Sequence, residues 1–291
     1  MANEGGRQVE SFFATNPRDG VRVHGLRCGT GPQHILAIHG VNAHAWHWRR
    51  VAERLGPEYS LVSYDLRGHG DSDKPEDGYS YAHQGTDIEA LLAHLDWEPV
   101  ETLILGHSLG ARLAVPYVAQ HPPLAFVIAD SAMITPPRSA PPAGTPPPAA
   151  GRVRQPLQME YASREEFMER MAKTNFLRNQ HEFNVEYAAQ LIGPPAEDGS
   201  VRLKLTPAAH QQTMASMMDA ELTSYLPKIQ CPTLIIRATE GNLSAEAAAL
   251  MLTEIVDSQL VVIEGSNHNA MLDRPDAFDA LLDPFLERIF G

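Results

Sequence analysis

Short apolar segments alternate with longer amphipathic segments along most of this chain. Runs rich in valine, isoleucine and leucine predict strands at residues 21–26, 34–38, 61–64, 102–105, 125–129, 233–236 and 260–263. Most of these runs are continuously apolar, which is typical of strands buried on both faces. Apolar residues recur every three or four positions in residues 81–95, 109–120, 245–255 and 276–289, which predicts helices. The alternation predicts an α/β fold with a mostly parallel sheet.

The alternation is interrupted between residues 133 and 227. Residues 134–151 contain seven prolines, a density that excludes a helix or a central strand and predicts an exposed excursion. Helical patterns follow at residues 163–177, 181–191 and 207–222. Because strand patterns are few here, we interpret residues 133–227 as a mainly helical cap, in preference to a second independent domain. Residues 1–132 and 228–291 would then form one α/β core.

The charge of the chain argues against negatively charged partners. It has 36 acidic residues against 23 lysines and arginines, a net charge of -13, so its field repels nucleic acid and anionic lipid. The first ten residues hold no apolar run of a secretory signal, and no segment reaches the roughly 18 apolar residues of a spanning helix. We therefore expect a cytoplasmic protein without a membrane span. The pattern does not indicate an oligomeric state.

The strongest chemical motif is the G-x-S-x-G sequence of residues 106–110, which joins the predicted strand at 102–105 to the predicted helix at 109–120. A serine in such a turn carries its hydroxyl above the sheet, and the nearby glycines allow the backbone to bend that sharply. The amide of Leu109 and the positive end of its helix would stabilise a negatively charged oxygen. The motif predicts that Ser108 is a nucleophile.

The loop after the predicted strand at 34–38 offers a second amide for the same oxygen. Gly40 permits a turn that would bring the Val41 amide beside that of Leu109. His44 and Trp46 follow this loop, and we expect them to line the substrate pocket together with His107. For Trp48 two alternatives stay open: it lines the same pocket, or it belongs to the core in a first helix.

A serine hydroxyl needs a base, and the imidazole of histidine has a suitable pKa near 6.5. Among thirteen histidines, His268 is favoured because it lies in a polar loop between the last predicted strand and the last predicted helix. Loops that follow parallel strands converge at one edge of the sheet. The early histidines lack the spacing of a zinc motif, and Cys28 and Cys231 lack a metal or redox spacing. We therefore expect neither a metal nor another cofactor.

Four segments together resemble the α/β-hydrolase superfamily: residues 37–40 (AIHG), 64–72 (YDLRGHGDS), 106–110 (GHSLG) and 267–268 (NH). The resemblance spans nearly the whole chain outside the predicted cap. It implies an eight-stranded, mostly parallel sheet with helices on both faces, a lid, and a triad in the chain order serine, acid, histidine. The charged residues of the 65–72 segment are expected to form hydrogen bonds within their loop.

The acid of the triad departs from the commonest pattern of this family, which places an aspartate shortly after the strand predicted at 233–236. Residues 237–244 contain no aspartate, and Gly241 occupies the usual acid position with Glu240 before it. Some family members take the acid from the end of the preceding strand, where this chain has Asp130. We favour Asp130 and keep Glu240 as the alternative; either would orient the imidazole of His268.

These residues predict a serine hydrolase that cleaves a small-molecule carboxylic ester or lactone, with an apolar acyl group, through an acyl-enzyme on Ser108. Haloalkane dehalogenases and epoxide hydrolases resemble this fold but carry an aspartate at the nucleophile position. The same triad would also serve a carbon-carbon bond hydrolase or a perhydrolase. A receptor that binds a small molecule without turnover is a further alternative.

Overall fold

The computed structural model describes residues 8–133, 159–174, 182–219 and 221–291. The predicted proline-rich excursion at 134–151 lies outside these residues, as do the last three residues of the helix predicted at 163–177 and the first residue of that predicted at 181–191.

An eight-stranded sheet forms the centre of the molecule, with the strand order β1-β2-β4-β3-β5-β6-β9-β10. The pairs β1·β2 and β2·β4 are antiparallel and the other neighbours are parallel, which confirms the predicted mostly parallel sheet. Its strands are β1 (Val9–Thr15), β2 (Arg22–Cys28), β3 (Gln33–Ile38), β4 (Tyr59–Tyr64), β5 (Thr102–His107), β6 (Ala125–Ala129), β9 (Thr233–Glu240) and β10 (Ser258–Asn267).

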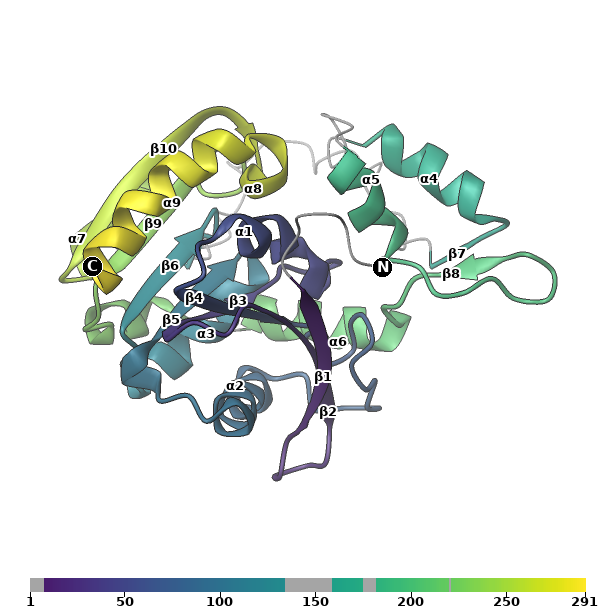
Figure 1. The fold of residues 1–291 in the computed structure, drawn as a ribbon, viewed down its shortest axis with the longest axis horizontal. Coiled ribbons are helices and arrows are strands. Elements are labelled where there is room, and N and C mark those ends of the chain that lie inside the picture. The colour runs from purple at the N-terminus through teal and green to yellow at the C-terminus, as the bar shows by residue number, and fades with distance from the viewer. Residues whose placement is uncertain (1–7, 134–158, 175–181, 220) are drawn as a thin grey trace, which may run out of the picture.

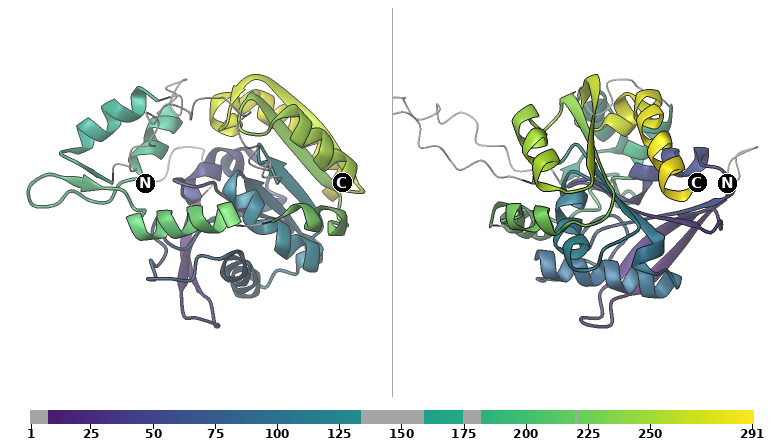
Figure 2. Two further views of the ribbon diagram at one scale, coloured as in Figure 1. Left: turned by 180° about the vertical axis from the view of Figure 1, so that it is seen from behind. Right: turned by 90° about the vertical axis from the view of Figure 1, so that its left-hand side faces the viewer.

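Helices cover both faces of this sheet (Figures 1 and 2). The helices of the core are α1 (Arg49–Arg54), α2 (Tyr81–Leu95), α3 (Leu109–Gln120), α7 (Ala245–Glu254), α8 (Ala270–Asp273) and α9 (Pro275–Phe290), with the short 3-10 helices η1 (Ala45–Trp48), η2 (Pro99–Glu101) and η4 (Thr223–Lys228). Successive residues of a strand face opposite sides of the sheet. Phe126 and Ile128 of β6 accordingly pack in the apolar cluster with α2, α3 and α7, whereas Val127 packs in the cluster with α1, α8 and α9. Two apolar layers therefore enclose the sheet.

The strand β1 was not predicted from the sequence. It lies at the edge of the sheet, where exposed and partly buried residues alternate irregularly and Ala14 alone is fully buried, so the apolar pattern is weak. Its position is fixed by packing, since the ring of Phe12 occupies the space where a side chain at Gly25 of β2 would lie. The predicted strands of the interior are all present, and most are longer than predicted.

The chain between β6 and β9 leaves the sheet and forms a separate layer (Figure 1). Its described elements before η4 are β7 (Glu160–Tyr161), α4 (Arg164–Ala172), α5 (Glu182–Ala189), β8 (Val201–Arg202) and α6 (Pro207–Asp219). The predicted helices are present and shorter than predicted, and β7 and β8 form a small antiparallel pair that the sequence analysis missed. Helix α5 is anchored to the core because the side-chain amide of Asn184 donates to the carbonyl of Leu272 at 3.1 Å. Within the described part of the chain, no helix combines the length and apolarity needed to cross a bilayer.

The loop after β4 contains a buried ion pair. Nη2 and Nε of Arg67 donate to the two carboxylate oxygens of Asp87 in α2, at 2.6 and 2.7 Å, and neither side chain is exposed. Arg67 also contacts Asp19 at 2.9 Å. The prediction that the charged residues of this loop bond within the loop is therefore wrong for Arg67, which instead joins the loop to α2.

Replacing Asp87 by alanine is expected to lower the free energy of unfolding by about 3 kcal/mol, because it leaves the buried guanidinium of Arg67 without its bidentate partner. The matched control is Glu89→Ala on the same helix, which breaks the exposed pair with Arg18 and should change stability by less than about 1 kcal/mol. Urea unfolding of both variants measures the difference. Equal losses of unfolding free energy in the two variants would show that the buried pair contributes no more to stability than the exposed pair.

Candidate active site

Ser108 stands in the sharp turn between β5 and α3. Its backbone has φ 51° and ψ −118°, a conformation that a residue with a side chain rarely adopts. The turn is tight enough that a side chain at Gly110 would lie 2.4 Å from the carbonyl oxygen of Ile38, and one at Gly106 would lie 2.4 Å from Ala111. The Ser108 amide donates to the carbonyl of Ala129 at 3.1 Å, which ties the turn to the end of β6.

The next residue after β6, Asp130, contacts His268 directly. Nδ1 of His268 lies 2.6 Å from Oδ2 of Asp130, whose side chain is 2% exposed. The backbone amides of Ala238 and Asn242 donate to the two oxygens of the same carboxylate, at 3.0 and 2.7 Å. Because the carboxylate accepts the proton on Nδ1, the neutral imidazole of His268 carries its lone pair on Nε2.

The glycine at the usual acid position makes room for this carboxylate. A side chain at Gly241 would place its Cβ 2.1 Å from Oδ2 of Asp130. Glu240 is exposed at the end of β9, where its backbone pairs with Asn267 of β10. Of the two acids proposed from the sequence, Asp130 is the one that the structure places at hydrogen-bonding distance from His268.

The loop after β3 meets the Ser108 turn. A side chain at Gly40 would lie 3.1 Å from Cβ of Ser108, so the two backbones approach closely there. His39 holds this loop: its Nδ1 donates to the carbonyl of Gly40 at 2.7 Å, and its Nε2 accepts from the amide of Leu66 at 3.0 Å. Since the two groups of a trans peptide point in opposite directions, fixing the Gly40 carbonyl also fixes the direction of the Val41 amide.

The three residues predicted to line the substrate pocket make contacts within the protein. His44 is buried, with Nε2 donating to the carbonyl of Tyr187 at 3.1 Å and Nδ1 accepting from the amide of Trp46 at 3.3 Å. The ring of Trp46 stacks under the guanidinium of Arg49 at 4.3 Å. His107 is also buried, and its Nε2 donates to the carbonyl of His268 at 2.8 Å.

Two residues near the site, Tyr187 and Trp48, could not be assigned a position from the sequence. Tyr187 of α5 stacks on His44 with the ring centroids 4.5 Å apart, and its hydroxyl lies 3.3 Å from Nδ1 of His47. Residues 181–191 were predicted as a helix, but no pattern indicated which of its side chains would meet the core. Trp48 is fully buried in the core, which settles the alternative left open for it.

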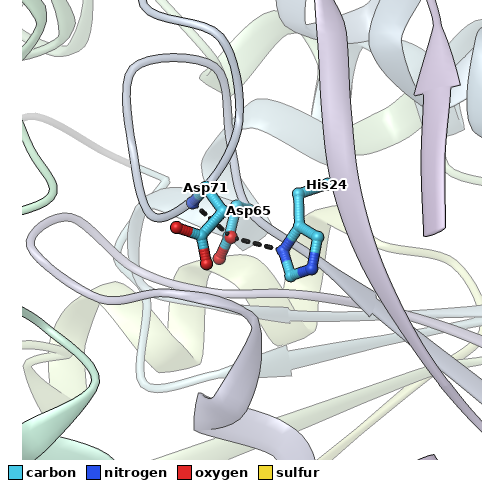
Figure 3. A group of neighbouring side chains, drawn as sticks. All are labelled: His24, Asp65 and Asp71. Carbon is cyan, nitrogen blue, oxygen red and sulfur yellow. Dashed lines mark hydrogen bonds and ion pairs between the residues drawn. The ribbon is translucent and has the colours of Figure 1, made fainter. Parts of the chain in front are cut away.

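A second cluster of polar groups, around Asp65, holds the loops behind the site (Figure 3). Its carboxylate accepts from Nδ1 of His24 at 2.8 Å and from the amides of Ala45 and Asp71 at 2.6 and 2.8 Å. Burial alone would raise the pKa of Asp65, but the hydrogen bond from His24 and the nearby histidines hold it below its usual range. Through these hydrogen bonds Asp65 joins β2, the loop after β4 and the first residue of η1.

The same cluster has the composition of a metal site, because ligand atoms of His24, Asp65 and Asp71 lie within 4.8 Å of one another. The neighbouring charges do not favour a cation. Asp71 already pairs with Lys204 at 2.9 Å, and the ammonium group of Lys74 binds two carbonyls of this loop. We therefore interpret the cluster as a structural hydrogen-bond network.

Acid should destabilise the protein through its buried histidines. Burial lowers the pKa of His39 to about 3 and those of His44 and His69 to about 4. In the unfolded chain these groups take up protons below a pH of about 6.5, whereas the folded chain resists protonation until near pH 4. The free energy of unfolding should therefore fall as the pH drops through this window, by up to about 1.4 kcal/mol per pH unit for each histidine.

Urea unfolding at a series of pH values measures this slope. His69→Asn keeps a donor for the carbonyl of Arg67 but removes one titrating ring, so its slope should be shallower by about one proton. The control is Gln120→Ala at the exposed end of α3, which removes no ionisable group and should keep the slope of the parent. Stability that is flat between pH 7 and 5 would contradict the expectation.

Comparison with known proteins places the fold. The profile of the Alpha/beta hydrolase family matches residues 35–281. An uncharacterized protein of Mycobacterium tuberculosis is 40% identical over 107 residues, which cover 35% of this chain and 30% of that protein, so the match spans less than a third of the relative's length. The 2-(acetamidomethylene)succinate hydrolase of Mesorhizobium japonicum is 29% identical over 247 residues, which cover 82% of each chain.

A solved structure of E-2-(acetamidomethylene)succinate hydrolase superposes with a TM-score of 0.76 at 24% identity, covering 95% of this chain and 100% of that one. That likeness concerns the fold. Since the family profile matches most of the sequence, the chain belongs to the alpha/beta hydrolase family.

Proposed function

We propose that this protein is a serine hydrolase that transfers the acyl group of a small-molecule ester or lactone to water. The observation that carries the proposal is the 2.6 Å contact between Nδ1 of His268 and Asp130, beside the strained turn that holds Ser108. The contact supports a role for Nε2 of His268 as the base. The turn supports a role for Ser108 as the nucleophile, because it places the residue before the first turn of α3.

In the proposed reaction the hydroxyl oxygen of Ser108 attacks the ester carbonyl carbon while its proton passes to Nε2 of His268. The amides of Val41 and Leu109, with the positive end of α3, would stabilise the negative oxygen of the tetrahedral intermediate. His268 then gives the proton to the leaving alcohol, and an acyl-enzyme remains. Water, deprotonated by His268, releases the acid and restores Ser108.

Asp130 would hold His268 in the required tautomer and stabilise the imidazolium that forms during each step. Its two backbone donors keep the carboxylate in one orientation. Glu240, which is exposed at the end of β9, remains the alternative acid.

We propose that residues 133–227 form the cap over this site, inserted into a core of residues 1–132 and 228–291. The contacts of α5 with residues that follow β3 and β10 support this arrangement. His44, Trp46 and His107 would form walls of the pocket. His44 would not bind polar groups of the substrate, because both of its nitrogens already bind protein groups. An apolar acyl group suits such walls.

A second candidate is hydrolysis of an amide-type substrate that carries carboxylates. It is favoured by the relative named 2-(acetamidomethylene)succinate hydrolase, whose match covers 82% of both chains. The same three side chains would also serve cleavage of a carbon-carbon bond, or perhydrolysis. A receptor without turnover would keep the pocket but release no product.

The proposal is tested by multiple-turnover release of p-nitrophenol from short acyl esters, run beside lactones, diketone acids and acetamido dicarboxylates. Ser108→Ala and His268→Ala should each lower kcat on the order of 10⁶-fold, by analogy with a serine protease triad. A fluorophosphonate should label the parent protein and not the Ser108→Ala variant. Turnover near the parent's in either alanine variant would show that the site is assigned wrongly, and labelling without turnover would favour the receptor.

The choice of acid is tested by comparing Asp130→Asn with Glu240→Gln in the same assay. Asp130→Asn should lower kcat by about 10⁴-fold, as in a serine protease, because the amide favours the wrong tautomer of His268. Glu240→Gln should stay within a few fold of the parent. A selective loss in the glutamine variant would reverse the assignment.

The space at Gly241 offers an independent test. Gly241→Ala should lower kcat by about 10- to 100-fold, because the added Cβ would displace Asp130 from His268. The control is Gly85→Ala in α2, where an added Cβ meets nothing within 4 Å. Circular dichroism and urea unfolding would show that both variants are folded; normal turnover in a folded Gly241→Ala protein would contradict the proposed role of Asp130.

A further inference from the structure

His107 connects the turn of Ser108 to the residue that carries the base. Its Nε2 lies 2.8 Å from the carbonyl oxygen of His268, and the two rings lie 4.6 Å apart. A carbonyl can only accept, so Nε2 of His107 carries a hydrogen. Burial lowers the pKa of His107 well below its ordinary value, so the ring is neutral and this hydrogen is its only donor.

The ring of His107 is itself held from the other side. His47 stacks on it with the centroids 4.8 Å apart and the planes 22° apart. Tyr187 of α5 lies edge-on to His47 at 5.6 Å, and its hydroxyl is 3.3 Å from Nδ1 of that ring. All three side chains are buried, so a continuous column of rings runs from α5 to His268.

We infer that His107 is a positioning residue for His268, and that α5 supports it through Tyr187 and His47; the kinetic part of this inference rests on the function proposed above. Asp130 fixes the imidazole of His268 at Nδ1, and His107 fixes its backbone at the carbonyl. Two anchors at opposite ends of one residue define where Nε2 points.

The second anchor is needed because of where His268 stands. It follows the last residue of β10 directly, outside the ladder of hydrogen bonds, and its side chain is 24% exposed. With the carbonyl released, the backbone can move while the imidazole still contacts Asp130. A displacement of about 1 Å between a base and its nucleophile is enough to lower a rate by up to about 10²-fold.

Three variants separate the donor from the ring. His107→Phe keeps an aromatic ring against His47 but removes the hydrogen bond, and should lower kcat at least tenfold with KM within about twofold. His107→Gln places an amide N–H near the position of Nε2 and should recover most of the lost rate. His121→Phe, at the exposed end of α3, is the matched control and should behave as the parent.

A spectroscopic readout keeps the inference independent of the proposed reaction. The proton between His268 and Asp130 lies in a short, charge-assisted hydrogen bond, and such protons resonate far downfield in proton NMR spectra. The signal is assigned by its loss in Asp130→Asn. It should broaden or shift in His107→Phe and return in His107→Gln, whether or not the parent protein turns over any ester.

The outcomes divide cleanly. A parent-like rate and signal in His107→Phe would overturn the inference, because the hydrogen bond would then position nothing. A His107→Gln protein as impaired as His107→Phe would also overturn it, because packing of the ring would be the cause. If the signal behaves as expected but the parent has no turnover, the inference stands and the proposed function fails.

The support from α5 is tested with Tyr187→Phe, which keeps the ring and removes the hydroxyl next to His47. It should lower kcat a few fold, and the loss should largely vanish in the His107→Phe background, because both changes act on the same column. Losses that multiply in the double variant would show that Tyr187 acts by another route and would overturn this part of the inference.

Discussion

The contact between Asp130 and His268 is the constraint on which the rest of the site depends. It joins residues that follow β6 and β10, two strands that β9 separates in the sheet. The same carboxylate binds the amides of Ala238 and Asn242 at the end of β9. One buried side chain therefore ties together the ends of three successive strands, and it does so only because Gly241 leaves the space free.

Around this contact the protein places neutral rings. His39, His44, His47 and His107 are all buried, and burial lowers the pKa of each. For three of them, carbonyl oxygens at one nitrogen set which nitrogen carries the hydrogen: Gly40 for His39, Tyr187 for His44 and His268 for His107. The direction of these hydrogen bonds is thus fixed without adding positive charge near His268.

The sequence was most informative where local pattern and chain position agree. Ser108 is predicted as the nucleophile from a motif between a strand and a helix, and His268 is predicted as the base from its place after the last strand. Asp130 was favoured as the acid because some members of the resembled family take it from that strand end. The adjacency of β6 and β9 in the structure shows in addition that Gly241 leaves room for its carboxylate. Other features depend on packing between segments that are distant in the sequence, so no local pattern predicts them. They are the contact of Tyr187 with His47, the ion pair of Arg67 with Asp87 and the edge strand β1.

The chain leaves the sheet after β6 and re-enters it at β9, yet both ends of this excursion are fixed by the sheet itself. The amides of Ser108 and Asp130 bind carbonyls of Ala129 and Ile236, which belong to those two strands. An evolving lineage can therefore lengthen, shorten or replace the excursion without shifting Ser108 or Asp130. Such modularity accounts for how one framework comes to serve descendants that differ in the molecules they accept.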